Sequence, residues 1–217
     1  MNRAVFAESL GSFFLFTTVI GSGIMAEQLS SGNVAVALLG NTLATGAMLF
    51  VLITMLGPIS GAHFNPAVTL IFRMRGELTT GTALAYSAAQ LVGGILGVWA
   101  AHLMFDLAVL QLSDKARTGI GQWTGELIAT FGLVLTIIGT LRSRQEWVPV
   151  SVALYIVAAY WFTSSTSFAN PAITVARSLS GSFAGIAPAD VAGFVVAQVA
   201  GAVLALGVSK VLFSRTD

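Results

Sequence analysis

The tripeptide Asn-Pro-Ala occurs twice in this chain, once at Asn65, Pro66 and Ala67 and once at Asn170, Pro171 and Ala172. Each copy predicts the start of a helix, because proline is favourable at the first helical position and asparagine is a strong N-cap. A helix N-terminus carries about half a positive charge. An asparagine whose side-chain carbonyl is held by backbone donors keeps its amide N–H groups for a ligand. Two such sites would favour a neutral molecule with a lone pair over a cation that has lost its water.

The two halves of the chain resemble each other around these motifs. The segment AESLGSFFLFTTVIG (7–21) aligns without gaps with GELIATFGLVLTIIG (125–139), and this alignment pairs Glu8 with Glu126. Further along, a second pair of matching segments aligns Gln90 with Gln198. Since an unpaired carboxylate inside a membrane span is costly, the recurrence of the glutamates predicts a partner for each of them. The alternative is a carboxylate that faces water or lipid headgroups.

The composition is that of a membrane protein. Hydrophobic residues make up 56% of the chain, charged residues only 9%, and the mean hydropathy is +0.87, whereas soluble domains carry about 25% charged residues. Crossing the hydrocarbon takes roughly 20 helical residues. Six apolar runs satisfy this length, at 4–26, 33–56, 80–106, 120–141, 148–166 and 189–213.

The stretches that follow the two motifs are too short to cross, so we expect re-entrant half-helices there. Such segments are tolerated at membrane depth only where protein or a water-filled cavity satisfies their backbone. The expected fold is therefore an all-α membrane protein with six transmembrane helices and two half-helices. It would form one domain over residues 1–217, with repeats at about 1–110 and 118–217. Three spans per repeat is an odd number, so the second repeat would be inverted relative to the first.

Basic residues predict the orientation of the chain in the membrane. On one side of the six-span arrangement lie Arg3, Arg73, Arg75, Arg142, Arg144, Lys210 and Arg215, and on the other side lie Lys115, Arg117 and Arg177. Because positive charge favours cytoplasmic loops, both termini are expected in the cytoplasm. We therefore expect a multi-pass protein of the cell (inner) membrane.

Several function classes do not fit the residues. The net charge is +1, with no cluster of Lys and Arg of the kind that binds phosphates, so nucleic acid is not an expected partner. The chain has no cysteine, and the separated His63 and His102 do not form a metal site. No nucleophile with a matching base can be assembled either, so we expect neither an enzyme nor a cofactor.

The segment SGAHFNPAVTL (60–70), the second Asn-Pro-Ala and the matched glutamates resemble the aquaporin family, also called the major intrinsic proteins. The resemblance covers nearly the whole chain. It implies the aquaporin fold, a pore in each protomer, and a homotetramer embedded in membrane lipid. By similarity, Asn65 and Asn170 would be donors at the pore centre, and Glu8 and Glu126 would brace the two re-entrant loops.

The histidine of the first motif also has a place in this resemblance. In the family, a histidine at the position of His63 lines the cytoplasmic part of the pore, sometimes as a pH-sensitive element. A pKa near 6.5 makes such a role chemically possible. A histidine that is simply packed or braces the loop fits the sequence equally well.

The chain departs from the family pattern after the second motif. Most members continue with arginine, which narrows the outer constriction and repels cations, whereas position 173 is isoleucine here. Counting by the family's spacing, without gaps, predicts a selectivity filter formed by Thr45, Ala158, Ser167 and Ile173. A filter of these residues would be wide and weakly polar.

Arg177 is a possible substitute for the missing arginine. It lies four residues beyond Ile173, so on a helix it stands about 6 Å farther out and within about 40° of the same direction. This spacing predicts a place in the outer vestibule. The alternative is a side chain that snorkels to headgroups or binds loop carbonyls.

Together these features predict a passive channel for water and small uncharged solutes. The sequence NPAIT, without arginine, is similar to that of aquaporin-like channels linked to bacterial arsenic-resistance operons. Glycerol-like polyols and neutral arsenite or related metalloid hydroxides are therefore the expected solutes. A water-selective aquaporin is the main alternative, and an ion-coupled secondary transporter is another. Residues 112–119 could still fold into the vestibule and narrow it.

Overall fold

The structure is a computed structural model that describes residues 2–213. Arg215, one of the residues used to predict the orientation, lies outside this range. The α-helices of the described chain are α1 (Arg3–Leu29), α2 (Val34–Ser60), α3 (Pro66–Met74), α4 (Thr80–Met104), α5 (Ile120–Ser143), α6 (Val148–Phe162), α7 (Pro171–Arg177) and α8 (Val191–Leu212). Two 3-10 turns are also present, η1 (Gln145–Trp147) and η2 (Pro188–Asp190). No strand occurs within residues 2–213. The predicted all-α fold with six long helices and two half-helices is confirmed.

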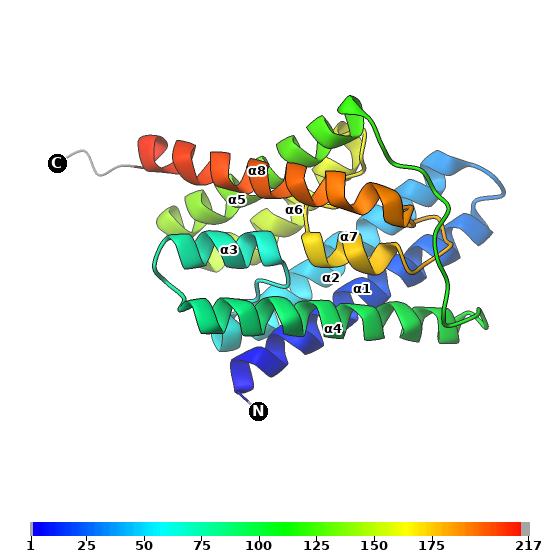
Figure 1. The fold of residues 1–217 in the computed structure, drawn as a ribbon, viewed down its shortest axis with the longest axis horizontal. Coiled ribbons are helices and arrows are strands. Elements are labelled where there is room, and N and C mark those ends of the chain that lie inside the picture. The colour runs from blue at the N-terminus through cyan, green and yellow to red at the C-terminus, as the bar shows by residue number, and fades with distance from the viewer. Residues whose placement is uncertain (1, 214–217) are drawn as a thin grey trace.

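The two short helices lie inside the bundle of long ones. Figure 1 shows α3 and α7 end to end between α4 and α8, with both helices starting near the middle of the molecule and running in opposite directions. Helix α1 begins and α8 ends toward the same end of the bundle, which is also the end where α3 finishes. The second Asn-Pro-Ala therefore starts a helix that is antiparallel to the first.

Of the six longer helices, all except α6 have the length and the hydropathy needed to cross a membrane. Helix α6 has 15 residues and is preceded directly by η1. The sequence predicted this span to reach residue 166, but α6 ends at Phe162, where Thr163 turns to an extended conformation with ψ 139°. The last residues of the apolar run therefore belong to the loop that leads to the second motif.

The long helices approach most closely at glycines that occupy matching places in the two repeats. A Cβ atom on Gly93 of α4 would stand 2.1 Å from the backbone oxygen of Ser9 on α1, and one on Gly201 of α8 would stand 2.2 Å from that of Leu127 on α5. Small residues allow such backbone contacts between membrane helices. These crossings hold α1 against α4 and α5 against α8, and each pair carries part of the bracing described below.

Candidate functional site

Each Asn-Pro-Ala asparagine caps its half-helix. The Oδ1 atom of Asn65 accepts a hydrogen bond from the backbone N–H of Ala67 at 2.9 Å. The Oδ1 atom of Asn170 accepts from Ala172 at 3.0 Å and from Ile173 at 3.3 Å. The side-chain carbonyls are thus held by the first turns of α3 and α7, and the amide groups are turned toward the opposite loop.

The two asparagines are tied across the centre of the molecule. Asn65 donates from Nδ2 to the carbonyl oxygen of Ala169 at 2.7 Å, and Asn170 donates from Nδ2 to that of Phe64 at 2.8 Å. An amide nitrogen carries two N–H donors, so each asparagine uses one for the opposite loop and has one more. Both side chains line the large cavity described below. The structure therefore places two amide donors and two helix N-termini at one point on its wall.

The loops before the motifs have the same unusual backbone conformation. Positive φ angles occur at Ala62 (51°) and Phe64 (48°) in the first loop and at Ser167 (48°) and Ala169 (48°) in the second. These are the third and first residues before each asparagine. A non-glycine residue in this region costs on the order of 1–3 kcal/mol. Such loops need support from elsewhere in the protein.

Glu8 supplies that support to the first loop. Its carboxylate accepts hydrogen bonds from the backbone N–H groups of His63 (2.9 Å) and Phe64 (2.7 Å) and from the side chains of Ser60 (2.6 Å) and Gln90 (2.7 Å). The side chain is fully buried. Four donors on one carboxylate match the number of its lone-pair sites, so the glutamate is satisfied by protein rather than by water or lipid.

Glu126 makes the same contacts in the second repeat. Its carboxylate accepts from the backbone N–H groups of Phe168 and Ala169, both at 2.8 Å, and from Gln198 Nε2 at 2.6 Å. The two glutamines also reach the half-helices, since Gln90 donates to Thr69 Oγ1 (3.0 Å) and Gln198 to Thr174 Oγ1 (2.8 Å). The buried ends of α1 and α5 are thus connected to the loops they face.

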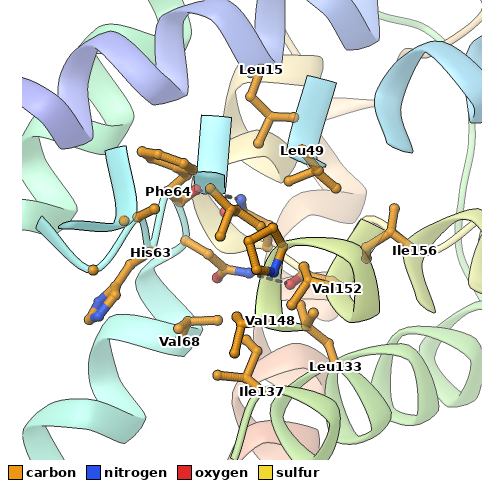
Figure 2. Close-up of a pocket in the computed structure, with 18 of the residues that line it drawn as sticks. Leu15, Leu49, His63, Phe64, Val68, Leu133, Ile137, Val148, Val152 and Ile156 are labelled. Atoms are coloured by element: carbon orange, nitrogen blue, oxygen red, sulfur yellow. Dashed lines mark hydrogen bonds between the residues drawn. The ribbon is translucent and has the colours of Figure 1, made fainter. Parts of the chain in front are cut away.

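A cavity of about 980 Å³ runs along these groups. It extends from charged residues at the end of the bundle where α1 begins and α8 ends, Arg75, Glu77 and Glu146, past both asparagines to Arg177. Figure 2 shows aliphatic side chains, Leu15, Leu49, Leu133, Val152 and Ile156 among them, around the hydrogen bonds at its middle. The wall is therefore mostly apolar in its middle part, with polar groups at the asparagines and at both ends.

The predicted filter residues do not all reach this cavity. Thr45, Ser167 and Ile173 line it, but Ala158 does not. Ala158 is exposed on the outer side of α6, and Tyr160, two residues later, occupies the wall instead, with its hydroxyl 3.5 Å from Thr45 Oγ1. The assignment of Ala158 is therefore wrong. Counting without gaps misjudged the length of the loop between α6 and the second motif.

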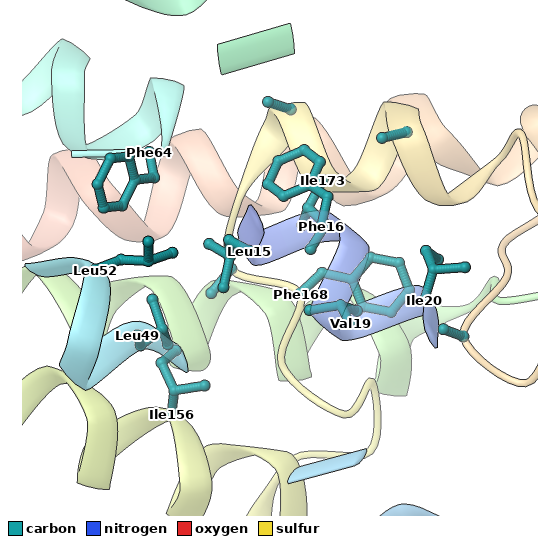
Figure 3. Packing of buried hydrophobic residues seen from close by; sticks show 14 of the residues in the cluster. Leu15, Phe16, Val19, Ile20, Leu49, Leu52, Phe64, Ile156, Phe168 and Ile173 are labelled. Carbon is teal, nitrogen blue, oxygen red and sulfur yellow. The ribbon is translucent and has the colours of Figure 1, made fainter. Parts of the chain in front are cut away.

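This correction changes the character of the far end of the cavity. A phenol ring and hydroxyl stand where the sequence predicted a methyl group, so the expectation of a weakly polar filter does not hold on the α6 side. The Ser167 hydroxyl is buried and has no hydrogen-bond partner in the described part of the chain. Ile173 belongs with Phe168 to the buried cluster that also contains Phe16 and Val19 (Figure 3).

Arg177 is not at a vestibule surface. The last residue of α7, it is 2% exposed and lines the cavity. Its Nε donates to the carbonyl oxygen of Ala184, and its guanidinium lies over the ring of Phe168, with Cζ 3.3 Å from the ring centroid. The contact with the Ala184 carbonyl is of the kind expected under the alternative, in which Arg177 binds loop carbonyls, whereas the side chain is buried in the cavity wall rather than exposed in an outer vestibule.

His63 lines the cavity nearer the other end. Its Nδ1 lies 3.1 Å from Thr69 Oγ1, and its ring packs against Phe72 and Tyr86 at centroid distances of 4.6 and 5.6 Å. In Figure 2 the ring lies to one side of the aliphatic residues. The histidine is thus both packed and adjacent to the cavity.

The long loop between α4 and α5 lies beyond Arg177. Ser113 N–H donates to the carbonyl oxygen of Ser178 at 2.9 Å, and Ala187 N–H donates to that of Lys115 at 2.8 Å. Burial lowers the pKa of Lys115, and the positive charges of Arg117 and Arg177 lower it further. Residues 105–119 supply no side chain to the cavity wall, so this loop covers the segment after α7.

In residues 2–213 there is no group of three or more His, Asp or Glu side chains that could hold a metal ion. His102, the second histidine, is buried between Val109 O (3.0 Å) and Ser180 Oγ (2.9 Å), where it ties two loops together. The sequence analysis did not identify Tyr160 as a residue of the cavity wall, and it did not identify the serines of the two loops. For the bracing network a signal was available in the sequence, because Gln90 and Gln198 recur at matched places in the two repeats.

Comparisons with known proteins agree with this geometry. The family model described as "Major intrinsic protein" matches residues 1–165. The chain is 54% identical over 210 residues to aquaglyceroporin AqpS of Rhizobium meliloti (strain 1021), a match that covers 97% of this chain and 90% of the relative. It is 32% identical over 200 residues to aquaporin PIP2-3 of Zea mays, covering 82% and 69% of the two chains.

A solved structure has the same fold. The aquaglyceroporin from Plasmodium falciparum aligns with a TM-score of 0.75 at 20% sequence identity, over 98% of this chain and 96% of that one. At this identity the likeness concerns the fold alone. The family model and the relative with 54% identity establish more than the fold: the chain belongs to the major intrinsic protein family, whose members are integral membrane channels.

Proposed function

We propose that this chain is a passive transmembrane channel for water and small neutral solutes such as glycerol. The observation that carries the proposal is the pair of asparagine amides, Asn65 and Asn170, fixed by cross-loop hydrogen bonds on the wall of a long, mostly apolar cavity. The described residues lining the cavity near its centre carry no carboxylate. A coupled transporter would need an ionisable or carbonyl-rich site in that path.

The distribution of polar groups suits a solute with one polar and one apolar side. The asparagine amides, the Tyr160 and Thr45 hydroxyls and the Ser167 hydroxyl offer donors and acceptors, while Leu15, Leu49 and Ile156 form apolar wall. Few, well-placed polar groups in an apolar surround are typical of sites for small molecules. Glycerol has this amphipathic character, and neutral arsenite is a trihydroxide of similar shape, so we extend the proposal to arsenite and related metalloid hydroxides.

The setting of the channel is part of the same proposal. We place it in the inner membrane with both termini in the cytoplasm, as a single channel domain of two inverted repeats that assembles into a homotetramer. Large apolar side chains remain exposed on the outer helix faces, for example Phe50, Leu154 and Trp161. Exposed apolar surface of this extent is expected to face lipid or neighbouring subunits. We propose no catalytic activity and no cofactor.

The proposal is tested by stopped-flow light scattering on proteoliposomes that contain the native chain or Ile173→Arg. Water, glycerol and neutral arsenite permeability are measured in parallel. We expect the native protein to pass all three and the added arginine, in the cavity wall that Tyr160 and Thr45 also line, to reduce glycerol and arsenite flux at least about tenfold. Fast water flux without solute passage in the native protein would replace the proposal with a water-selective channel. Solute flux that collapses with the proton gradient would indicate a coupled transporter.

A further inference from the structure

We propose that Arg177 provides the cation barrier at the outer end of the pore, in place of the arginine that position 173 lacks. The inference rests on the proposed channel function and adds to it a residue that determines specificity. Arg177 is separated from Ile173 by about one helical turn. Its long side chain nevertheless reaches the wall that Ile173, Ser167, Thr45 and Tyr160 share.

The guanidinium is held rigidly in this place. Its Nε donates to the Ala184 carbonyl oxygen, and the group stacks on the ring of Phe168. That ring is fixed in turn, because the Phe168 N–H donates to Glu126 at 2.8 Å and the ring packs edge-on against Phe194 at 5.0 Å between centroids. An arginine fixed at one side by a carbonyl and at one face by an aromatic ring presents its charge in a constant position.

The guanidinium of Arg177 is not held in an ion pair within the described residues. Arg177 is 2% exposed, and its Nη1 has no hydrogen-bond partner within residues 2–213. None of the described carboxylates forms an ion pair with it. Glu126, the buried carboxylate of this repeat, interacts with Arg177 through space, but its oxygens accept from the N–H groups of the loop and of Gln198 rather than from the guanidinium. The guanidinium therefore stands at the cavity wall without a carboxylate in direct contact.

A second arginine reinforces the same field. The Cζ of Arg117 lies 5.0 Å from the centroid of the Phe168 ring, so two guanidinium groups share one phenyl ring. Arg117 donates from Nε to Gly185 O (2.8 Å) and from Nη1 to Ser165 O (3.2 Å), and it does not line the cavity. It contributes charge from behind the wall, whereas Arg177 contributes charge at the wall.

This arrangement separates cations from neutral solutes. A cation entering from the far end meets Arg177 first, in a confined, low-dielectric space where charges interact strongly, and then the two helix N-termini at the asparagines. A polyol meets a donor that its hydroxyl oxygens accept. Isoleucine at position 173 thus leaves room for the solute while the charge remains, displaced by one turn.

The test compares Arg177→Gln, which removes the charge, with Arg177→Lys, which keeps it without the planar stack. Proteoliposomes are assayed for Na⁺ and K⁺ leak and for glycerol flux, and the readout is the ratio of cation to glycerol permeability. Arg73→Gln is the matched control, since Arg73 is the arginine near the end of the first half-helix and does not line the cavity. We expect Arg177→Gln to raise the ratio at least about tenfold, and Arg177→Lys and Arg73→Gln to stay within about threefold of the native ratio.

The outcomes separate this inference from the proposed function. A native protein without glycerol flux would refute the channel proposal whatever its cation leak. A native protein that conducts glycerol, together with an Arg177→Gln ratio equal to the native one, would refute the barrier. Equal leak in the Gln and Lys variants would assign Arg177 to loop bracing and also overturn it. If Arg177→Gln does not assemble, Arg177→Met carries the same test, and failure of both neutral variants beside an assembled Lys variant would count against the barrier.

Discussion

Replacing Glu126 by glutamine should disturb the loop at the pore centre, although the two side chains have nearly the same size and shape. The native carboxylate accepts from the N–H groups of Phe168 and Ala169 and from Gln198 Nε2. A glutamine of the same shape has one oxygen and one amide nitrogen, and the nitrogen is a donor. In either amide orientation, at least one native donor faces another donor.

The magnitude follows from the number of bonds affected. Hydrogen bonds to a charged group contribute about 1.5–3 kcal/mol each, and a buried donor left unsatisfied costs about 1–3 kcal/mol. One such loss beside the strained residues Ser167 and Ala169, with φ angles of 48°, should destabilise the protein by about 2–5 kcal/mol. Because the second loop carries the Ala169 carbonyl to which Asn65 donates, the loss should also reach the first motif and lower glycerol flux.

The assay is thermal unfolding of the purified protein in detergent, together with glycerol permeability of proteoliposomes that contain matched amounts of protein. Glu8→Gln is the symmetric comparison and should behave similarly, because Glu8 accepts the corresponding bonds in the first loop. Glu27→Gln, at an exposed position near the end of α1 that does not line the cavity, should leave both quantities unchanged. Native stability and native flux in Glu126→Gln would show that the carboxylate does not hold the loop, and the bracing argument would fail.

Two further pairs of substitutions, each a test with its control, probe the helix crossing and the filter. Gly201→Ala places a Cβ 2.2 Å from the backbone oxygen of Leu127, and this overpacking should lower the free energy of unfolding by about 1–3 kcal/mol. On the same helix, a Cβ at Gly207 meets nothing within 4 Å, so Gly207→Ala should be neutral or slightly stabilising in the same unfolding assay. Tyr160→Ala should raise the glycerol-to-water permeability ratio several-fold because a ring leaves the wall, while Ala158→Leu, on the exposed side of α6, should leave it unchanged; the reverse pattern would restore Ala158 to the filter.

The sequence alone determined the features that depend on neighbours in the chain. Hydropathy and run length were enough for the membrane class and five of the six spans. The start of each half-helix was predictable because proline and a capping asparagine act on the next turn of the same helix. The opposite directions of the two half-helices followed from an odd number of spans in each repeat, and the recurrence of the glutamates predicted a partner for each carboxylate. Only the structure identified Gln90 and Gln198 among those partners.

The tertiary structure decided which side chains face the cavity. A helix turns about 100° per residue, so a register error of two residues rotates a position by about 200°. That rotation is enough to take the filter position from the wall to the outer surface, and it is why Tyr160 rather than Ala158 lines the cavity. The register could not be determined from the sequence, because no local sequence pattern fixes the length of the loop between α6 and the second motif.

Arg177 illustrates the same limit over a longer reach. Its backbone position on α7 was predictable from its distance to the second motif, but the direction of its side chain was not. The ring of Phe168 and the carbonyl of Ala184 draw the guanidinium toward the cavity. The loop that contains Ala184 reaches this place only after the chain has folded. The sequence therefore determined which types of residue could line the pore. The direction in which these side chains point depends on contacts between segments that come together only in the folded protein.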